Sequence, residues 1–235
     1  MKDNVKKNEM KYVGIGIAVF FIYMFLPSFQ TIPLDLFNVD ITNMPLYLKV
    51  IYMIIFEIIL MSIIIYIFRN KLKDDISNIK ENHKVYFSKY LKIWILSVGI
   101  MMISNLLISV VLPDTLPSNE EALRALFDKS PIYIFFSAVI FAPIVEELVF
   151  RQGFRYIFKT KWLFILMAGL IFGALHVLSS AESFTELLYI IPYSAPGIAF
   201  AYILTKTENI LVTIGFHFMH NGILIALQFL LMILA

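Results

Sequence analysis

Two adjacent carboxylates stand inside an apolar stretch in the second half of the chain. Residues 142–155 read APIVEELVFRQGFR and contain Glu146 and Glu147. An ionised carboxylate is costly inside a bilayer, so it usually faces a protein interior or a wet cavity and usually has a function. A carboxylate in such a cavity can act as a general base that activates water. The pair is therefore the first candidate for chemistry.

Helix geometry assigns the two glutamates to different surroundings. Neighbouring residues on a helix point about 100° apart, so the two side chains cannot face one small cavity equally well. Glu147 lies four residues before Arg151, in the order that favours an ion pair on one helix face. This leaves Glu146 as the free carboxylate and the candidate base. The alternative is that both glutamates pair with Arg151 and Arg155 and only hold two helices together.

A second group of polar residues follows in other apolar runs. His217 and Asn221 are four residues apart and share one helix face. A histidine with a carboxamide one turn further on can bind a metal, orient a water or donate to a developing oxyanion. His220 is a rival for the same role, and His176 lies near the end of an earlier run. A single histidine in an apolar helix is more often a packing residue. A shared function therefore requires that these histidines, Asn221 and Glu146 lie at a common depth in the membrane.

The rise of 1.5 Å per residue places these side chains at similar depths. Counted from the cytoplasmic interface, Glu146 and Asn221 lie about 18 Å deep, His176 about 21 Å and His217 about 12 Å. The hydrocarbon core is about 30 Å thick. The agreement requires the helix that carries Glu146 to continue past Arg151 to about residue 158.

The composition identifies the class of protein. Of the 235 residues, 60% are hydrophobic and 15% are charged, and the mean hydropathy is +0.83. Soluble domains have about 45–50% apolar and about 25% charged residues, so we expect an all-α, polytopic membrane helix bundle. The chain has no cysteine, which excludes disulfides, thiolate ligands and a cysteine nucleophile.

Seven apolar runs are long enough to span a bilayer. They are residues 11–29, 46–68, 90–112, 131–158, 162–178, 185–205 and 209–234. The first run lacks a small-residue cleavage site and is expected to remain as a membrane helix. A break at Pro192, Pro196 and Gly197 would make eight spans and bring the carboxyl terminus to the other side. Glu57 and Asn105, within two early spans, are expected only to hydrogen-bond between helices.

The charges of the connecting segments alternate along the chain. The amino-terminal tail, residues 69–92 and residues 151–161 are rich in Lys and Arg, whereas residues 113–130 are mainly acidic. The positive-inside rule therefore predicts a cytoplasmic amino terminus and, with seven spans, an outer carboxyl terminus. The sequence SNEE at 118–121 is typical of a helix start. We expect an amino-terminal three-helix region, 1–129, and a membrane core, 130–235, within one integral unit.

Three short patterns occur in order in the second half of the chain. They are EELVFR at 146–151, FGALH at 172–176 and HFMHN at 217–221. They resemble the EExxxR, FxxxH and HxxxN motifs of the CAAX-protease and bacteriocin-processing family of intramembrane proteases. The resemblance covers residues 130–225 and leaves the first three helices outside. The chain departs from the family pattern at one position: the glycine expected directly after the motif arginine is replaced by Gln152, and a glycine follows at Gly153. This difference concerns helix packing more than chemistry.

The resemblance implies a role for each motif residue. The implied catalytic set is Glu146, His176, His217 and Asn221, with Glu147, Arg151 and Phe172 in support. Glu146 would activate a water that attacks a peptide carbonyl, and His217 and Asn221 would stabilise the oxyanion. His176 would hold the water or a metal. If Zn²⁺ is used, Glu146, His176 and His217 would be its ligands; a metal-free glutamate mechanism is the alternative, because Glu146 could hardly be both a tight ligand and the free base.

The implied substrate is a membrane-associated peptide or protein precursor, bound from the membrane or its cytoplasmic side during maturation of a secreted peptide. The expected partners are membrane lipids and this precursor, with no nucleic acid, and the expected location is a bacterial cell membrane. The oligomeric state stays open. Two other classes fit the same residues. One is a catalytically silent scaffold or bacteriocin-immunity protein; the other is a proton-coupled transporter, since buried carboxylates and histidines also form proton relays.

Overall fold

The chain folds into helices joined by short connections. The computed structural model describes residues 2–113 and 115–234, except for the side chains of residues 2–8 and 42. Three lysines that contribute to the predicted orientation, Lys2, Lys6 and Lys7, are among these side chains. The elements are α1 (Lys2–Phe25), η1 (Leu26–Phe29), α2 (Ile32–Leu36), η2 (Ile41–Asn43), α3 (Leu46–Val111), α4 (Ser118–Lys129), α5 (Pro131–Ile134), η3 (Phe135–Phe141), α6 (Ala142–Glu146), η4 (Glu147–Gly153), α7 (Phe154–Ile157), α8 (Lys161–Leu178), η5 (Phe184–Tyr189), α9 (Ile190–Thr207) and α10 (Ile210–Leu234). The described residues contain no strand.

Six helical stretches of the described residues are long and apolar enough to cross a membrane. They are Glu9–Leu36, Leu46–Val111, Pro131–Ile157, Lys161–Leu178, Phe184–Thr207 and Ile210–Leu234. This confirms the predicted polytopic membrane helix bundle. The helix start expected at SNEE is also present, because α4 begins at Ser118.

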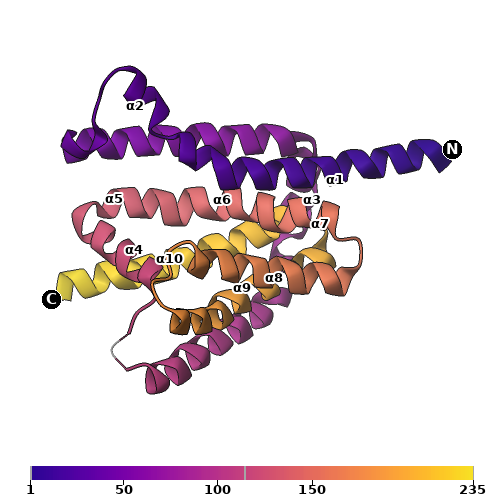
Figure 1. Ribbon diagram of the computed structural model, residues 1–235. Coiled ribbons are helices and arrows are strands. Elements are labelled where there is room, and N and C mark those ends of the chain that lie inside the picture. Colours follow the sequence, from indigo (N-terminus) through magenta and orange to yellow (C-terminus); the bar gives the residue numbers. More distant parts are fainter. Residues whose placement is uncertain (1, 114, 235) are drawn as a thin grey trace.

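The expected separation of residues 46–68 and 90–112 into two helices is wrong. Residues 46–111 form one helix of 66 residues, about 99 Å long if it were straight, or about three times the hydrocarbon core. Figure 1 shows instead that α3 is bent into two arms that run along opposite sides of the bundle. The charged connector, residues 69–92, includes the bend and contains no Pro or Gly to end the helix, so the backbone stays helical through the bend. The two arms provide the two predicted passes.

The alternative with eight spans is also wrong. Helix α9 is continuous from Ile190 to Thr207, with Pro196 inside it. Pro192 lies in the first turn, where a backbone N–H has no partner within the helix and its absence is tolerated. The two termini consequently lie at opposite ends of the bundle (Figure 1).

The bend of α3 is attached to the turn between α9 and α10. Asp75 accepts a hydrogen bond from the backbone N–H of Ile210 at 3.0 Å, and its carbonyl accepts one from the Asn209 amide at 2.9 Å. This carboxylate satisfies a donor that the start of α10 would otherwise leave unpaired. The charged connector and the loop between α9 and α10 therefore share one end of the bundle.

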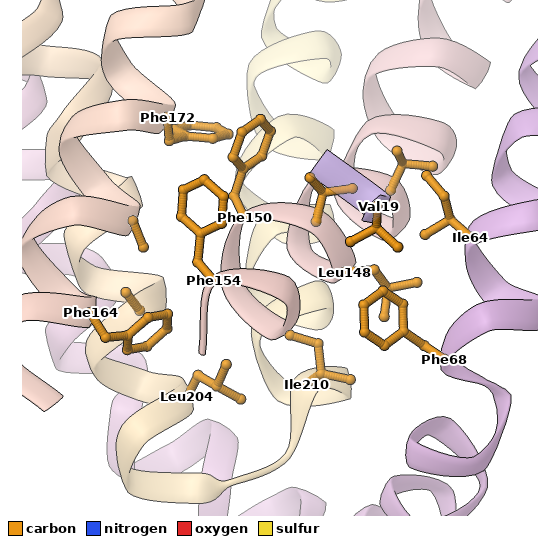
Figure 2. Packing of buried hydrophobic residues seen from close by; sticks show 14 of the residues in the cluster. Val19, Ile64, Phe68, Leu148, Phe150, Phe154, Phe164, Phe172, Leu204 and Ile210 are labelled. Carbon is orange, nitrogen blue, oxygen red and sulfur yellow. The ribbon is translucent and has the colours of Figure 1, made fainter. Parts of the chain in front are cut away.

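One hydrophobic core joins the early and late parts of the chain. Val19 of α1 and Ile64 of α3 pack in the same buried cluster as Leu148 of η4, and all three are 0% exposed. Figure 2 shows side chains of α8, α9 and α10 converging on this region as well. The predicted 1–129 and 130–235 regions thus pack as neighbours around a common interior.

Helices α8 and α9 approach each other through glycines. A Cβ on Gly173 would contact the Ser194 side chain and the backbone of Ile190, and one on Gly169 would contact Ile198. Small residues allow this close packing of membrane helices. The contact also brings the last turn of α8, with His176, against the first half of α9.

Candidate active site

The two glutamates lie at a change of helix type. The stretch Pro131–Ile157 is helical throughout, as the depth comparison requires, but π-helical segments precede and follow α6. Glu146 is the last residue of α6 and Glu147 the first of η4. Pro143 cannot donate the backbone hydrogen bond of a regular α-helix, which favours an irregular turn before it. π-Turns are frequent at functional sites.

Glu146 faces a cavity and is 9% exposed. One of its carboxylate oxygens, Oε1, accepts a long hydrogen bond of 3.5 Å from the Tyr23 hydroxyl. The other, Oε2, lies 3.8 Å from Nε2 of His217. Sequence reasoning missed Tyr23, because α1 lies outside the three motifs and a tyrosine in an apolar run carries no distinctive pattern.

Glu147 is fully buried and contacts both a histidine and an arginine. Its Oε1 lies 3.0 Å from Nδ1 of His217, and its Oε2 lies 3.5 Å from Nε of Arg151, the expected ion pair. A carboxylate can only accept, so Nδ1 of His217 carries the hydrogen. This bond fixes the orientation of the ring and leaves Nε2 directed toward Glu146.

Arg151 is held by aromatic rings as well as by Glu147. Its guanidinium carbon lies 4.3 Å from the centre of the Phe172 ring and 5.7 Å from that of Phe200. Such cation–π contacts are strongest where water is excluded, and Arg151 is 0% exposed. Phe172, the first residue of the second motif, therefore helps to hold the first motif.

His176 is oriented by its own helix. Its Nδ1 lies 2.9 Å from the Phe172 carbonyl; because a carbonyl only accepts, Nδ1 carries the hydrogen and Nε2 is left for another partner. The ring stacks on Tyr193 with 5.2 Å between centres. The Tyr193 hydroxyl accepts a 2.7 Å hydrogen bond from the Asn119 amide of α4. A helix outside the motifs thus contacts the ring that supports His176.

Asn221 is anchored to the helix that carries the glutamates. Its side-chain amide donates to the Ala138 carbonyl of η3 at 2.7 Å. His217, one turn earlier on α10, contacts the glutamates. One face of α10 therefore contacts the helix of the glutamates at two positions, near Ala138 and at residues 146–147.

A single cavity of about 490 Å³ is lined by all four residues of the implied catalytic set, Glu146, His176, His217 and Asn221. Glu147 and Arg151 do not line it and lie behind its wall. His220 also lines the cavity and meets Trp94 edge-on at 6.4 Å. Both histidines of the third motif are therefore present, but His217 is the one in contact with the glutamates.

The expected zinc ligands do not form a metal site as arranged. Within the described part of the chain, no three His, Asp or Glu side chains are grouped so that they could hold one ion. Nδ1 of His217 is bonded to Glu147 and Nδ1 of His176 to a carbonyl, so Nε2 is the nitrogen of each ring that could bind a metal. Glu146, His176 and His217 share the cavity without forming a three-ligand group.

The two unassigned intramembrane polar residues have separate environments. Glu57 accepts hydrogen bonds from Tyr133 at 2.9 Å and Ser137 at 2.7 Å, so it links α3 to the helix of the glutamates. Asn105 lines a groove on the second arm of α3. The expectation that Glu57 bonds between helices is correct.

Comparisons with known proteins agree with the motifs. Residues 128–223 match the family model of Rce1-like type II CAAX prenyl endopeptidases. The chain is 31% identical over 114 residues to "Putative membrane peptidase YdiL" of Bacillus subtilis, covering 47% of this chain and 43% of that protein. It is 29% identical over 149 residues to "Membrane-embedded CAAX protease MroQ" of Staphylococcus aureus, covering 60% of each. The chain thus spans about half the length of these relatives. No solved structure matches it significantly.

Proposed function

The chain belongs to the CAAX-protease and bacteriocin-processing family through residues 128–223, and from the geometry of its site we propose that it is an intramembrane endopeptidase. Its substrate is a membrane-associated peptide or protein precursor, and its cavity provides the water-containing space in which a peptide bond is hydrolysed. The proposed role is maturation of a secreted peptide in a bacterial cell membrane.

The observation that carries the proposal is the position of His217 between two carboxylates. Glu147 binds Nδ1 at 3.0 Å, while Oε2 of Glu146 lies 3.8 Å from Nε2. A histidine oriented by a buried carboxylate, with its second nitrogen directed to an acid in a cavity, is an arrangement suited to proton transfer. A pair of charges that served only to hold helices together would not require a cavity beside it.

The reaction proceeds through Glu146. Its carboxylate takes a proton from a water in the cavity, and the water oxygen forms a bond to the peptide carbonyl carbon. Asn221, through its second amide hydrogen, and His217, through Nε2 when the ring is protonated, donate hydrogen bonds to the oxyanion that develops. The proton on Glu146 then passes to the departing amide nitrogen as the C–N bond breaks. His176 positions the water through Nε2.

Of the two mechanisms we propose the metal-free one, and its support is that the three predicted ligands do not form a three-ligand group in the described part of the chain. We expect the purified protein to keep its cleavage activity after treatment with a strong zinc chelator. An activity that is lost with the chelator and restored by Zn²⁺ would show that the site rearranges around a metal.

The orientation follows from the distribution of charge. We place the amino terminus, the bend of α3 and residues 155–161 in the cytoplasm, because the Lys and Arg residues concentrate there. The carboxyl terminus and α4 then lie on the outer side.

The central experiment compares cells that produce Glu146→Gln with cells that produce the unchanged chain. The amide preserves size but cannot take a proton, so we expect an uncut precursor to accumulate in the membrane fraction, as measured by mass spectrometry of its peptides. His217→Ala should accumulate the same species. His83→Ala is the matched control, since His83 is exposed on the cytoplasmic connector and away from the cavity.

The scaffold alternative predicts the opposite result. If Glu146→Gln folds, reaches the membrane and retains full function with no precursor accumulated, the protein acts without catalysis. If the variant and the unchanged protein unfold at the same temperature in detergent, a difference between them reflects lost catalysis and not lost folding.

A further inference from the structure

The cavity extends from Glu146 toward one end of the bundle, as its described lining residues show. On α10 its lining runs from His217 toward Leu231, and on the helix of the glutamates it runs from Glu146 back toward Ile134. Both directions lead to the end where the carboxyl terminus lies (Figure 1). The described residues that line the cavity include none from the bend of α3 or from residues 151–161.

Helix α4 lies at this mouth. Asn119, Glu120, Leu123 and Arg124 line the cavity, and α4 is attached across it through the Asn119–Tyr193 hydrogen bond. Glu120 and Arg124 form an exposed ion pair at 2.8 Å. A short helix with charges on one face and apolar residues on the other is suited to the surface of a membrane.

An apolar groove of about 810 Å³ leads away from the same mouth. It runs along the second arm of α3, past Met102, Leu106 and Ser109, to Pro192 of α9. The groove and the cavity share lining residues, namely Met101, Glu120, Arg124, Tyr193 and Leu224. The groove and the cavity therefore adjoin at these residues, and the groove opens on a surface that contacts the apolar part of the bilayer.

Charge identifies the side on which this mouth lies. Of the 19 Lys and Arg residues, only Lys49, Arg124 and Lys129 belong to the elements at the mouth end, and Arg151 is buried at the site. All the others lie in the amino-terminal tail, the bend of α3, residues 155–161 or the last turn of α9. Such an asymmetry places the lysine-rich end in the cytoplasm, and the mouth is at the other end.

We propose that the candidate active site receives its substrate from the outer side of the membrane, as an apolar peptide segment that enters beneath α4 from the groove on the second arm of α3. The mainly apolar lining of the groove and its position directly beside the cavity indicate an apolar segment as the occupant. The peptide nature of the occupant rests on the proposed function, whereas the side of entry rests on the charges and the cavity. The resemblance implied binding from the membrane or its cytoplasmic side; this entry keeps the membrane route and replaces the cytoplasmic side by the outer side.

The absence of cysteine from the chain permits a direct test of the side. Single variants Gln228→Cys in the cavity, Glu120→Cys at the mouth and Lys84→Cys on the connector are treated with a membrane-impermeant methanethiosulfonate. Cells are treated intact or after permeabilisation, and the remaining thiols are counted by mass-tagging with a maleimide. We expect the first two variants to be modified equally in both preparations and Lys84→Cys to be modified only after permeabilisation.

Two results overturn the inference. If Gln228→Cys and Glu120→Cys require permeabilisation while Lys84→Cys does not, the mouth faces the cytoplasm. If Glu120→Cys reacts and Gln228→Cys reacts in neither preparation, the mouth does not lead to the cavity. The labelling needs no catalysis and is repeated with Glu146→Gln, so failure of the proposed protease activity leaves this measurement unchanged.

Two neighbouring leucines test the groove. Leu106 and Leu107 are 65% and 63% exposed, but only Leu106 is a groove residue. We expect Leu106→Trp to increase the uncut precursor identified with Glu146→Gln, because the indole fills the groove, and Leu107→Trp to leave it at the unchanged level. Equal effects of the two substitutions would exclude the groove as the route.

Discussion

At the scale of single residues, His217 connects two carboxylates that adjoin in the sequence but face different surroundings. Glu147 and Arg151 are 0% exposed, and Glu146 borders the cavity. The two glutamates face different surroundings because neighbouring residues on a helix point about 100° apart. Glu147 nevertheless does more than pair with Arg151, because it also orients the histidine that faces Glu146.

Glu147 is therefore expected to affect the reaction through His217. Removing the carboxylate that orients a metal-bound histidine costs about 10- to 100-fold in activity; because Glu147 orients His217 in the same way, we expect a fall of similar size in the cleavage rate of Glu147→Gln. The change also leaves Arg151 buried without its partner, at about 3–5 kcal/mol. Both the cleavage rate and thermal unfolding in detergent are measured.

A double variant distinguishes the two effects of Glu147. In Glu147→Gln/Arg151→Met the buried charge is removed together with its partner, so most of the stability should return while cleavage stays slow. Return of the cleavage rate as well would mean that Glu147 acts only through the ion pair.

Tyr23 is a further expected contributor at this scale. Tyr23→Phe removes the hydroxyl that donates to Glu146 and keeps the ring, which packs edge-on against Phe150 at 5.1 Å. Hydrogen bonds to charged groups contribute about 1.5–3 kcal/mol; since this one is long, we expect a loss of about tenfold or less in cleavage rate. Tyr12→Phe on the same helix is the control, because Tyr12 packs on Tyr156. Equal rates for all three proteins would remove Tyr23 from the site.

At the scale of elements, close contact between α8 and α9 positions His176. The ring of His176 stacks on Tyr193 three residues beyond the point where Gly173 touches Ser194 and Ile190. A side chain at Gly173 would separate the helices and shift both rings.

Gly173→Ala is expected to destabilise the protein by about 1–3 kcal/mol, since the added methyl group meets backbone atoms that cannot move aside. Gly99 provides the matched control, because a Cβ there has nothing within 4 Å. Gly99→Ala should be neutral or stabilise by up to about 1 kcal/mol through helix propensity. Thermal unfolding in detergent measures both, and equal shifts would show that the α8–α9 contact tolerates a side chain.

At the scale of the whole molecule, the two predicted regions share their interior. Val19 and Ile64 pack with Leu148 in one core, and the bend of α3 is attached to the start of α10 through Asp75. The early helices consequently support the site from outside the region that matches the family.

Asp75 is expected to contribute to the stability of this arrangement. Asp75→Ala removes the acceptor of the Ile210 N–H, and loss of such a cap typically costs about 0.5–2 kcal/mol. Asp74→Ala changes an exposed neighbour of the same charge and should leave thermal unfolding unchanged. A similar loss in both variants would point to net charge rather than to the cap.

The sequence by itself determined the membrane class, the Glu147–Arg151 pair and the depth at which the motif residues meet. These follow from composition and from the rise and rotation of a helix, which are local properties. Tertiary structure decided what depends on contacts between distant segments. It brought Tyr23 to Glu146, placed His217 between the glutamates, bent α3 and directed the cavity to the end away from the basic residues. The pattern of residue types along one helix shows which of its faces is buried, but it does not specify which face of another helix packs against it.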